Sequence, residues 1–201
     1  MIVSASYRTD IPAFYGRWFM NRLDAGSCGV LNAYNGKTHS VSLQRQDVDG
    51  LVFRTKNIGP FLEPLQEIHR RGLPFVVQYT INGYSAALER SIPLPEQTIM
   101  LLISLFNSYD TRTAVWRYDP IIESDLTQFD WHLANFGRLA TALRGATDEV
   151  VVYFAQIYQK PAETLMPLPG AKALSGPIQI PANKKRLQND WPGLPLITAC
   201  A

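Results

Sequence analysis

Two arginine–aspartate pairs in the sequence have the spacing needed to act together. They are Arg8 with Asp10 and Arg117 with Asp119, and each stands at the end of a short apolar run. Residues two apart in a strand point to the same side, so each pair would present a guanidinium beside a carboxylate. Such a pair can be a plain ion pair. An arginine fork also binds carboxylate and phosphate groups through two parallel hydrogen bonds.

Other polar side chains follow the remaining apolar runs. Gln78 and Thr80 share one phase of their run, and Asn57 comes just after another. If these runs are parallel strands, their carboxyl ends meet at one rim, where α/β proteins build their sites. We therefore predict a rim that binds a small polar or anionic molecule, with Tyr79 or Tyr118 as walls. Its residues are Arg8, Asp10, Asn57, Gln78, Tyr79, Arg117, Tyr118 and Asp119.

The apolar runs alternate with helical patterns, which is typical of repeated strand–helix units. We predict strands at residues 1–7, 28–33, 50–55, 74–81, 113–118 and 149–154, with a seventh possible at 196–200. Helices are expected after Pro12, after Pro60, near Pro95 and after Thr127, where Thr127 and Asp130 resemble a capping box. The turn signal Asn35-Gly36, followed by alternation in residues 38–43, also allows a small hairpin.

Two architectures fit this order of elements. One is an open doubly wound sheet, and the other is an incomplete (β/α) TIM-like barrel of six to seven parallel strands with outer helices. A complete barrel takes about 250 residues, whereas this chain has 201. We expect one barrel-type domain over residues 1–201, irregular from about residue 161, where prolines accumulate.

Composition narrows the classes of function. A net charge of +2 argues against an extended nucleic-acid surface. The longest apolar stretch, residues 99–106, is far short of the ~20 residues that a membrane span needs. We expect a cytoplasmic protein without a membrane partner. Two cysteines, Cys28 and Cys200, are too few for a site of three or four thiolates, so no metal or cofactor is expected in this chain.

Five segments together resemble a known family. The resemblance runs in the same order over about residues 1–160, and the segments are 4–14, 34–36, 49–57, 78–84 and 115–121. They are similar to an uncharacterised bacterial family named domain of unknown function 1848. The resemblance implies a barrel of the radical S-adenosylmethionine type, distantly similar to spore photoproduct lyase. For an intact member it implies S-adenosylmethionine and a [4Fe–4S] cluster held by cysteines near the C-terminus.

The chain departs from the family pattern after residue 193. Residues 193–200 resemble a penultimate barrel strand that stops at its first cysteine, Cys200. One thiolate cannot hold a four-iron cluster. We therefore expect a C-terminally truncated member that is inactive as a radical enzyme. The open alternatives are a cluster-free barrel enzyme and a non-catalytic domain that binds a small anion. An incomplete barrel could also self-associate through its open edge.

Overall fold

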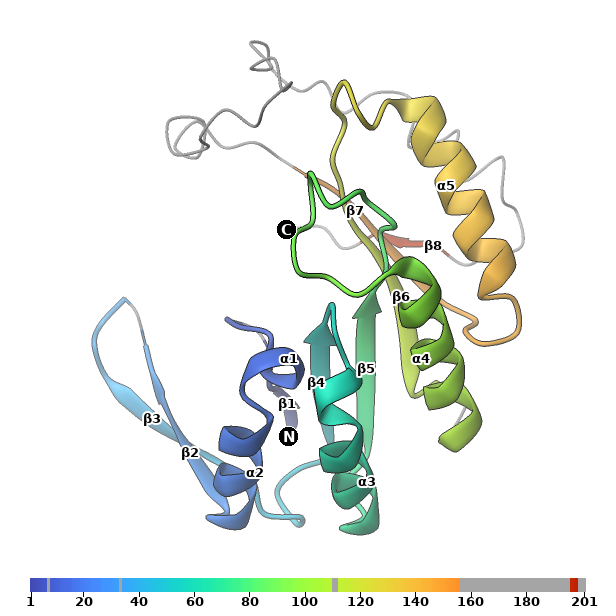
Figure 1. Ribbon diagram of the computed structural model, residues 1–201. Helices are drawn as coiled ribbons and strands as arrows, with labels where there is room; N and C mark the ends of the chain where they lie inside the picture. The colour runs from blue at the N-terminus through green and yellow to red at the C-terminus, as the bar shows by residue number, and fades with distance from the viewer. Residues whose placement is uncertain (7, 33, 110–111, 156–195, 199–201) are drawn as a thin grey trace.

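A curled parallel sheet forms the centre of the structure (Figure 1). The computed structural model describes residues 1–6, 8–32, 34–109, 112–155 and, for the backbone, 196–198. The sheet order is β1 (Ile2–Ser4), β4 (Gly50–Thr55), β5 (Phe75–Thr80), β6 (Ala114–Ile121), β7 (Val150–Phe154) and β8 (Leu196–Thr198), and every neighbouring pair is parallel. The prediction of an incomplete α/β barrel-like fold is confirmed at this level. The irregular stretch expected from about residue 161 to 195 lies outside the described residues.

One predicted strand does not belong to this sheet. Residues 28–33 were counted among the parallel strands, but β2 (Ser27–Leu31) pairs antiparallel with β3 (Thr38–Ser42) as a separate hairpin. The hairpin satisfies its own hydrogen bonds across the Asn35-Gly36 turn, and β1 pairs directly with β4. The hairpin predicted from that turn is therefore confirmed. Tyr34, beside this turn, is fully exposed.

The helices follow the predicted places with different ends. They are α1 (Ile11–Phe14), α2 (Gly16–Asp24), the 3₁₀ turn η1 (Gly59–Phe61), α3 (Leu62–Arg70), α4 (Pro95–Ser108) and α5 (Phe129–Ala142). The helix expected after Pro12 is interrupted at Tyr15. The capping box at Thr127 is wrong, because the Thr127 hydroxyl donates to the Ile122 carbonyl and α5 begins after Gln128. No helix in the described part of the chain is long and apolar enough to cross a bilayer.

The two faces of the sheet differ in chemistry. One phase of each strand is buried in a single core with residues from α2, α3, α4 and α5, so all four helices cover the same, outer face. Phe53, Val77, Trp116 and Val150 are among these strand residues, and each is 0% exposed. Because side chains alternate along a strand, the intervening residues face the other way, onto the inner face of the half-barrel. That inner face carries the polar side chains.

Candidate functional site

Four polar side chains meet on the inner face near the carboxyl ends of three adjacent strands. Arg54 in β4 lies opposite Gln78 in β5, and Arg117 in β6 lies opposite Thr80 in β5. Asp119 is two residues beyond Arg117 and shares its side of the strand. The parallel register thus brings Arg54, Gln78, Arg117 and Asp119 into one group, which we call the inner-face cluster.

Gln78 is the centre of the inner-face cluster. Its Oε1 accepts one hydrogen bond from Arg54 Nε, at 2.9 Å, and another from Arg117 Nη1, at 2.8 Å. Arg117 also forms an ion pair through Nη2 with Asp119 Oδ2. A single amide oxygen therefore holds two guanidinium groups close together, with one carboxylate beside them.

The electrostatics of the cluster favour a bound anion. The side chains of Arg117 and Asp119 are only 13% and 15% exposed. Burial and the nearby charge of Arg54 lower the pKa of Arg117 to about 10, so it stays cationic at neutral pH. Two cations face one carboxylate, which leaves an excess positive charge. Arg117 Nε is buried and has no hydrogen-bond partner among the described residues.

A second ion pair lies beside the cluster, between Lys56 after β4 and Glu89 in the loop that joins β5 to α4. The amide of Asn82, which is 2% exposed, connects the two groups. Its Nδ2 donates to Glu89 Oε1 at 3.0 Å and to the Asp119 carbonyl at 3.2 Å, and its Oδ1 accepts from the Asp119 N–H at 2.9 Å. Asn82 therefore fixes the loop against the end of β6.

The loop between β5 and α4 has further anchors on β6. The Tyr84 hydroxyl donates to the Pro120 carbonyl and accepts from the Ile122 N–H, each at 2.8 Å. Gly83 has a φ of +67°, and a Cβ there would lie 2.9 Å from Asn135 Oδ1. Glycine is thus required by both the backbone angle and the close approach of α5. The loop is held at a defined place over the carboxyl end of the sheet.

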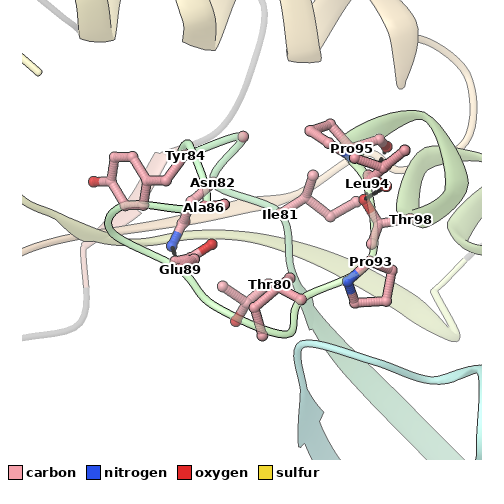
Figure 2. A pocket seen from close by; sticks show the side chains of 12 residues that line it. Thr80, Ile81, Asn82, Tyr84, Ala86, Glu89, Pro93, Leu94, Pro95 and Thr98 are labelled. Atoms are coloured by element: carbon pink, nitrogen blue, oxygen red, sulfur yellow. Dashed lines mark hydrogen bonds between the residues drawn. The ribbon is translucent and has the colours of Figure 1, made fainter. Parts of the chain in front are cut away.

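A small pocket of about 80 Å³ lies between this loop and the start of α4 (Figure 2). Thr80, Asn82 and Glu89 are among its polar lining residues, and Ile81, Ile92 and Leu94 are among its apolar ones. Thr80 is also the register partner of Arg117, so the pocket adjoins the inner-face cluster. Both features therefore lie at the carboxyl end of β5.

Three of the predicted rim residues form hydrogen bonds outside the inner-face cluster. The Asp10 carboxylate accepts from the Ala13 N–H at 3.0 Å, which caps α1, and from the Lys56 N–H at 2.9 Å. Asn57 Oδ1 accepts from the Gly59 N–H and closes the turn after β4. Exposed Arg8 donates to the Leu31 carbonyl at 3.0 Å. The structure brings Gln78, Arg117 and Asp119 together, and it shows no bond from Arg8, Asp10 or Asn57 to them.

The two predicted wall residues do not line the inner face. Tyr79 and Tyr118 are 0% and 1% exposed and belong to the core beneath the helices, because they are out of phase with Gln78 and Arg117. Burial raises the pKa of both hydroxyls to about 12. The Tyr79 hydroxyl has no hydrogen-bond partner within the described ranges. The expectation that these tyrosines wall the site is therefore corrected.

Tyr118 is part of a buried network with α5. His132 Nε2 lies 3.0 Å from the Ile122 carbonyl, which can only accept, so Nε2 carries the proton. The Tyr118 hydroxyl then donates to Nδ1 of His132 at 2.9 Å and accepts from Asn135 Nδ2 at 3.0 Å. His132 is 1% exposed, and burial lowers its pKa below the usual 6.5. The network requires a neutral imidazole.

This network predicts acid sensitivity. Below about pH 6.5, His132 becomes protonated in the unfolded chain, whereas in the folded protein its lowered pKa keeps it neutral to lower pH. The free energy of unfolding therefore falls as the pH drops. The slope is at most about 1.4 kcal/mol per pH unit for one proton. We expect His132→Gln to flatten this loss between pH 7 and pH 5 in urea titrations, and exposed His69→Gln to leave it unchanged. An equally steep loss in His132→Gln would assign the effect to other groups.

Comparison with protein families identifies the kinship of the chain. The model of one family, described as Domain of unknown function (DUF1848), matches residues 2–186. The chain belongs to this family. Curated proteins and solved structures gave no match. The DUF1848 match spans the inner-face cluster and the loop with Glu89, so both are features of the family region of the chain.

The DUF1848 site includes residues that the sequence analysis missed. Arg54 could have been predicted from the alternation of side chains, because it lies on the same side of its strand as Val52 and pairs in register with Gln78 of the next strand. Lys56 and Asn82 were visible as polar residues beyond strands, without a reason to pair them. Glu89 lies in a loop, and no periodic pattern signals its contact with Lys56. No group of three potential metal ligands occurs in the part of the chain that the structure describes.

Proposed function

We propose that the inner face of this half-barrel binds a small organic anion with a carboxylate or phosphate group. One observation carries the proposal: Arg54 and Arg117 converge on the same oxygen of Gln78, and among the described residues only the Asp119 carboxylate forms an ion pair with either of them. Two guanidinium groups held together repel each other unless an anion joins them. Guanidinium also has the geometry that matches carboxylate and phosphate oxygens.

The donors available for such an anion come from the two arginines. Arg54 uses Nε for Gln78, and its two terminal nitrogens have no hydrogen bond to the other described residues. Arg117 has an unpartnered Nε–H, and its own position is fixed by Gln78 and Asp119. Partial burial of Arg117 reduces solvent screening, which strengthens its attraction to an anion. In this proposal Gln78 and Asp119 act as positioning residues.

S-adenosylmethionine, which the family resemblance implies, is one candidate ligand under this proposal. Its methionyl carboxylate would meet Arg54 and Arg117, and its ammonium group would need a carboxylate such as Asp119. A [4Fe–4S] cluster fits the residues poorly, because the 201 residues contain two cysteines and such clusters are held by several thiolates. We therefore propose binding by the inner face and derive no radical step through a cluster.

The test is a titration of the protein with acetate, inorganic phosphate and S-adenosylmethionine, followed by calorimetry at 20 and 200 mM salt. We expect binding that weakens with salt, since the partners are charged. Arg54→Gln should weaken it roughly 10-fold, because a hydrogen bond between charged groups contributes about 1.5 kcal/mol or more. The matched control is Arg17→Gln, which removes an exposed arginine from α2, a helix on the outer face of the sheet.

The three ligands separate the forms of the proposal. Binding of acetate or phosphate that depends on Arg54 supports a general anion site. Binding of S-adenosylmethionine alone restricts the site to that cofactor. No Arg54-dependent binding of any of them up to millimolar concentration contradicts the proposed function.

A further inference from the structure

Glu89 presents an unused acceptor close to the cationic cluster. Its side chain is 12% exposed and lines the small pocket. Oε1 accepts hydrogen bonds from both the Lys56 ammonium and the Asn82 amide N–H. Oε2 receives no hydrogen bond from any residue that the structure describes. A carboxylate oxygen at a pocket wall is suited to accept from a hydroxyl or ammonium group of a ligand.

The position of the pocket relates this acceptor to the anion site. Thr80 lines the pocket, pairs in register with Arg117, and lies two residues beyond Gln78 on the same side of β5. Two residues of strand span about 7 Å. A short molecule can therefore reach from the arginines into the pocket along β5.

The pocket also limits what lies between the two ends of the ligand. Ile81, Ile92 and Leu94 offer apolar contacts and no charge. This lining favours an aliphatic linker between the two ends of the ligand.

From these observations, and resting on the proposed function, we infer the substrate class: a short acid with a hydroxyl or ammonium group at its far end. The acid group binds Arg54 and Arg117. The far group donates to Glu89 Oε2 in the pocket, while Lys56 and Asn82 keep the Glu89 carboxylate in place. Glu89 is then the residue that distinguishes a two-ended acid from a simple fatty acid of equal length.

Three acids of matched length test this inference: butyrate, 4-hydroxybutyrate and 4-aminobutyrate. We expect the wild-type protein to bind the hydroxy and amino acids at least 5-fold more tightly than butyrate. Glu89→Gln should remove the preference for 4-aminobutyrate over butyrate, while the substituted side chain keeps an amide oxygen for Asn82. Glu63→Gln in α3 removes an exposed carboxylate and is the matched control.

A second variant tests the pocket independently of Glu89. Ile92→Phe narrows the pocket and leaves the charged groups intact. It should lower the affinity for 4-hydroxybutyrate more than the affinity for acetate. Near-ultraviolet circular dichroism of the stacked Tyr84–Trp131 pair reports whether the loop between β5 and α4 keeps its conformation.

The outcomes separate the two proposals. Equal affinity of the wild-type protein for all three C4 acids overturns the substrate class and leaves the anion site intact. A preference for 4-aminobutyrate over butyrate that survives in Glu89→Gln also overturns it. Absence of binding by every acid, together with no Arg54-dependent binding of inorganic phosphate or S-adenosylmethionine, contradicts the proposed function itself.

Discussion

Arg117→Met is expected to abolish anion binding by the inner face and to lower the free energy of unfolding by about 1–3 kcal/mol. The first effect follows from removing the guanidinium that Gln78 and Asp119 hold in place. The second follows because Asp119, whose side chain is 15% exposed, loses its partner. Leaving a largely buried polar group unpaired costs about that much. Urea denaturation and ligand titration measure the two effects separately.

A double variant separates binding from stability. Arg117→Met with Asp119→Leu removes both members of the ion pair, so no charge is left unpaired there. Replacing a buried ion pair by apolar side chains is often neutral or stabilising. We expect the double variant to recover most of the stability and none of the anion affinity. Retained affinity in either variant would show that Arg117 is not part of the binding site.

The largest effect on stability is expected for Trp116→Ala, at about 3–5 kcal/mol. Trp116 is 0% exposed, stacks on Phe136 of α5 with ring centroids 4.9 Å apart, and donates its indole N–H to the Ile81 carbonyl at 3.0 Å. The substitution removes the stacking of Trp116 of β6 on Phe136 of α5 and opens a cavity beside Phe136. The free energy of unfolding in urea, monitored by circular dichroism, measures the loss.

Two controls accompany this prediction. Trp18→Ala in α2 removes a tryptophan that is 46% exposed, and we expect a change below about 1 kcal/mol. Trp116→Phe keeps an aromatic ring against Phe136 and loses the hydrogen bond to the Ile81 carbonyl. Its loss in the free energy of unfolding should therefore lie between those of Trp116→Ala and Trp18→Ala. Similar losses for Trp116→Ala and Trp18→Ala would contradict the core described for the outer face.

The sequence carried much of the information about the sheet and part of the information about the site. The apolar runs indicated the parallel strands because strands covered by helices are continuously apolar. Gln78, Arg117 and Asp119 were predicted together, and they do form one cluster. The alternation rule that unites them also sends Tyr79 and Tyr118 to the opposite face, a consequence that the choice of wall residues overlooked.

The remaining parts of the site depend on contacts between segments distant in sequence. Lys56 and Glu89 are 33 residues apart, and Asn82 reaches Asp119 across 37 residues. Loop conformation decides such contacts, and it has no periodic signature in a single sequence. The prediction that residues 28–33 join the parallel sheet was wrong for a related reason. An apolar run indicates a strand but not the neighbouring strand with which it pairs.

The buried amide of Asn82 has a consequence for how recognition is organised. Its three hydrogen bonds join the carboxylate of the loop to the backbone beside the cationic cluster, and all three are made between groups of the protein itself. The conformational entropy of arranging both ends of the site is therefore lost during folding rather than on association. A preorganised site of this kind lets a molecule with few atoms bind with useful affinity, because little ordering remains to oppose its capture.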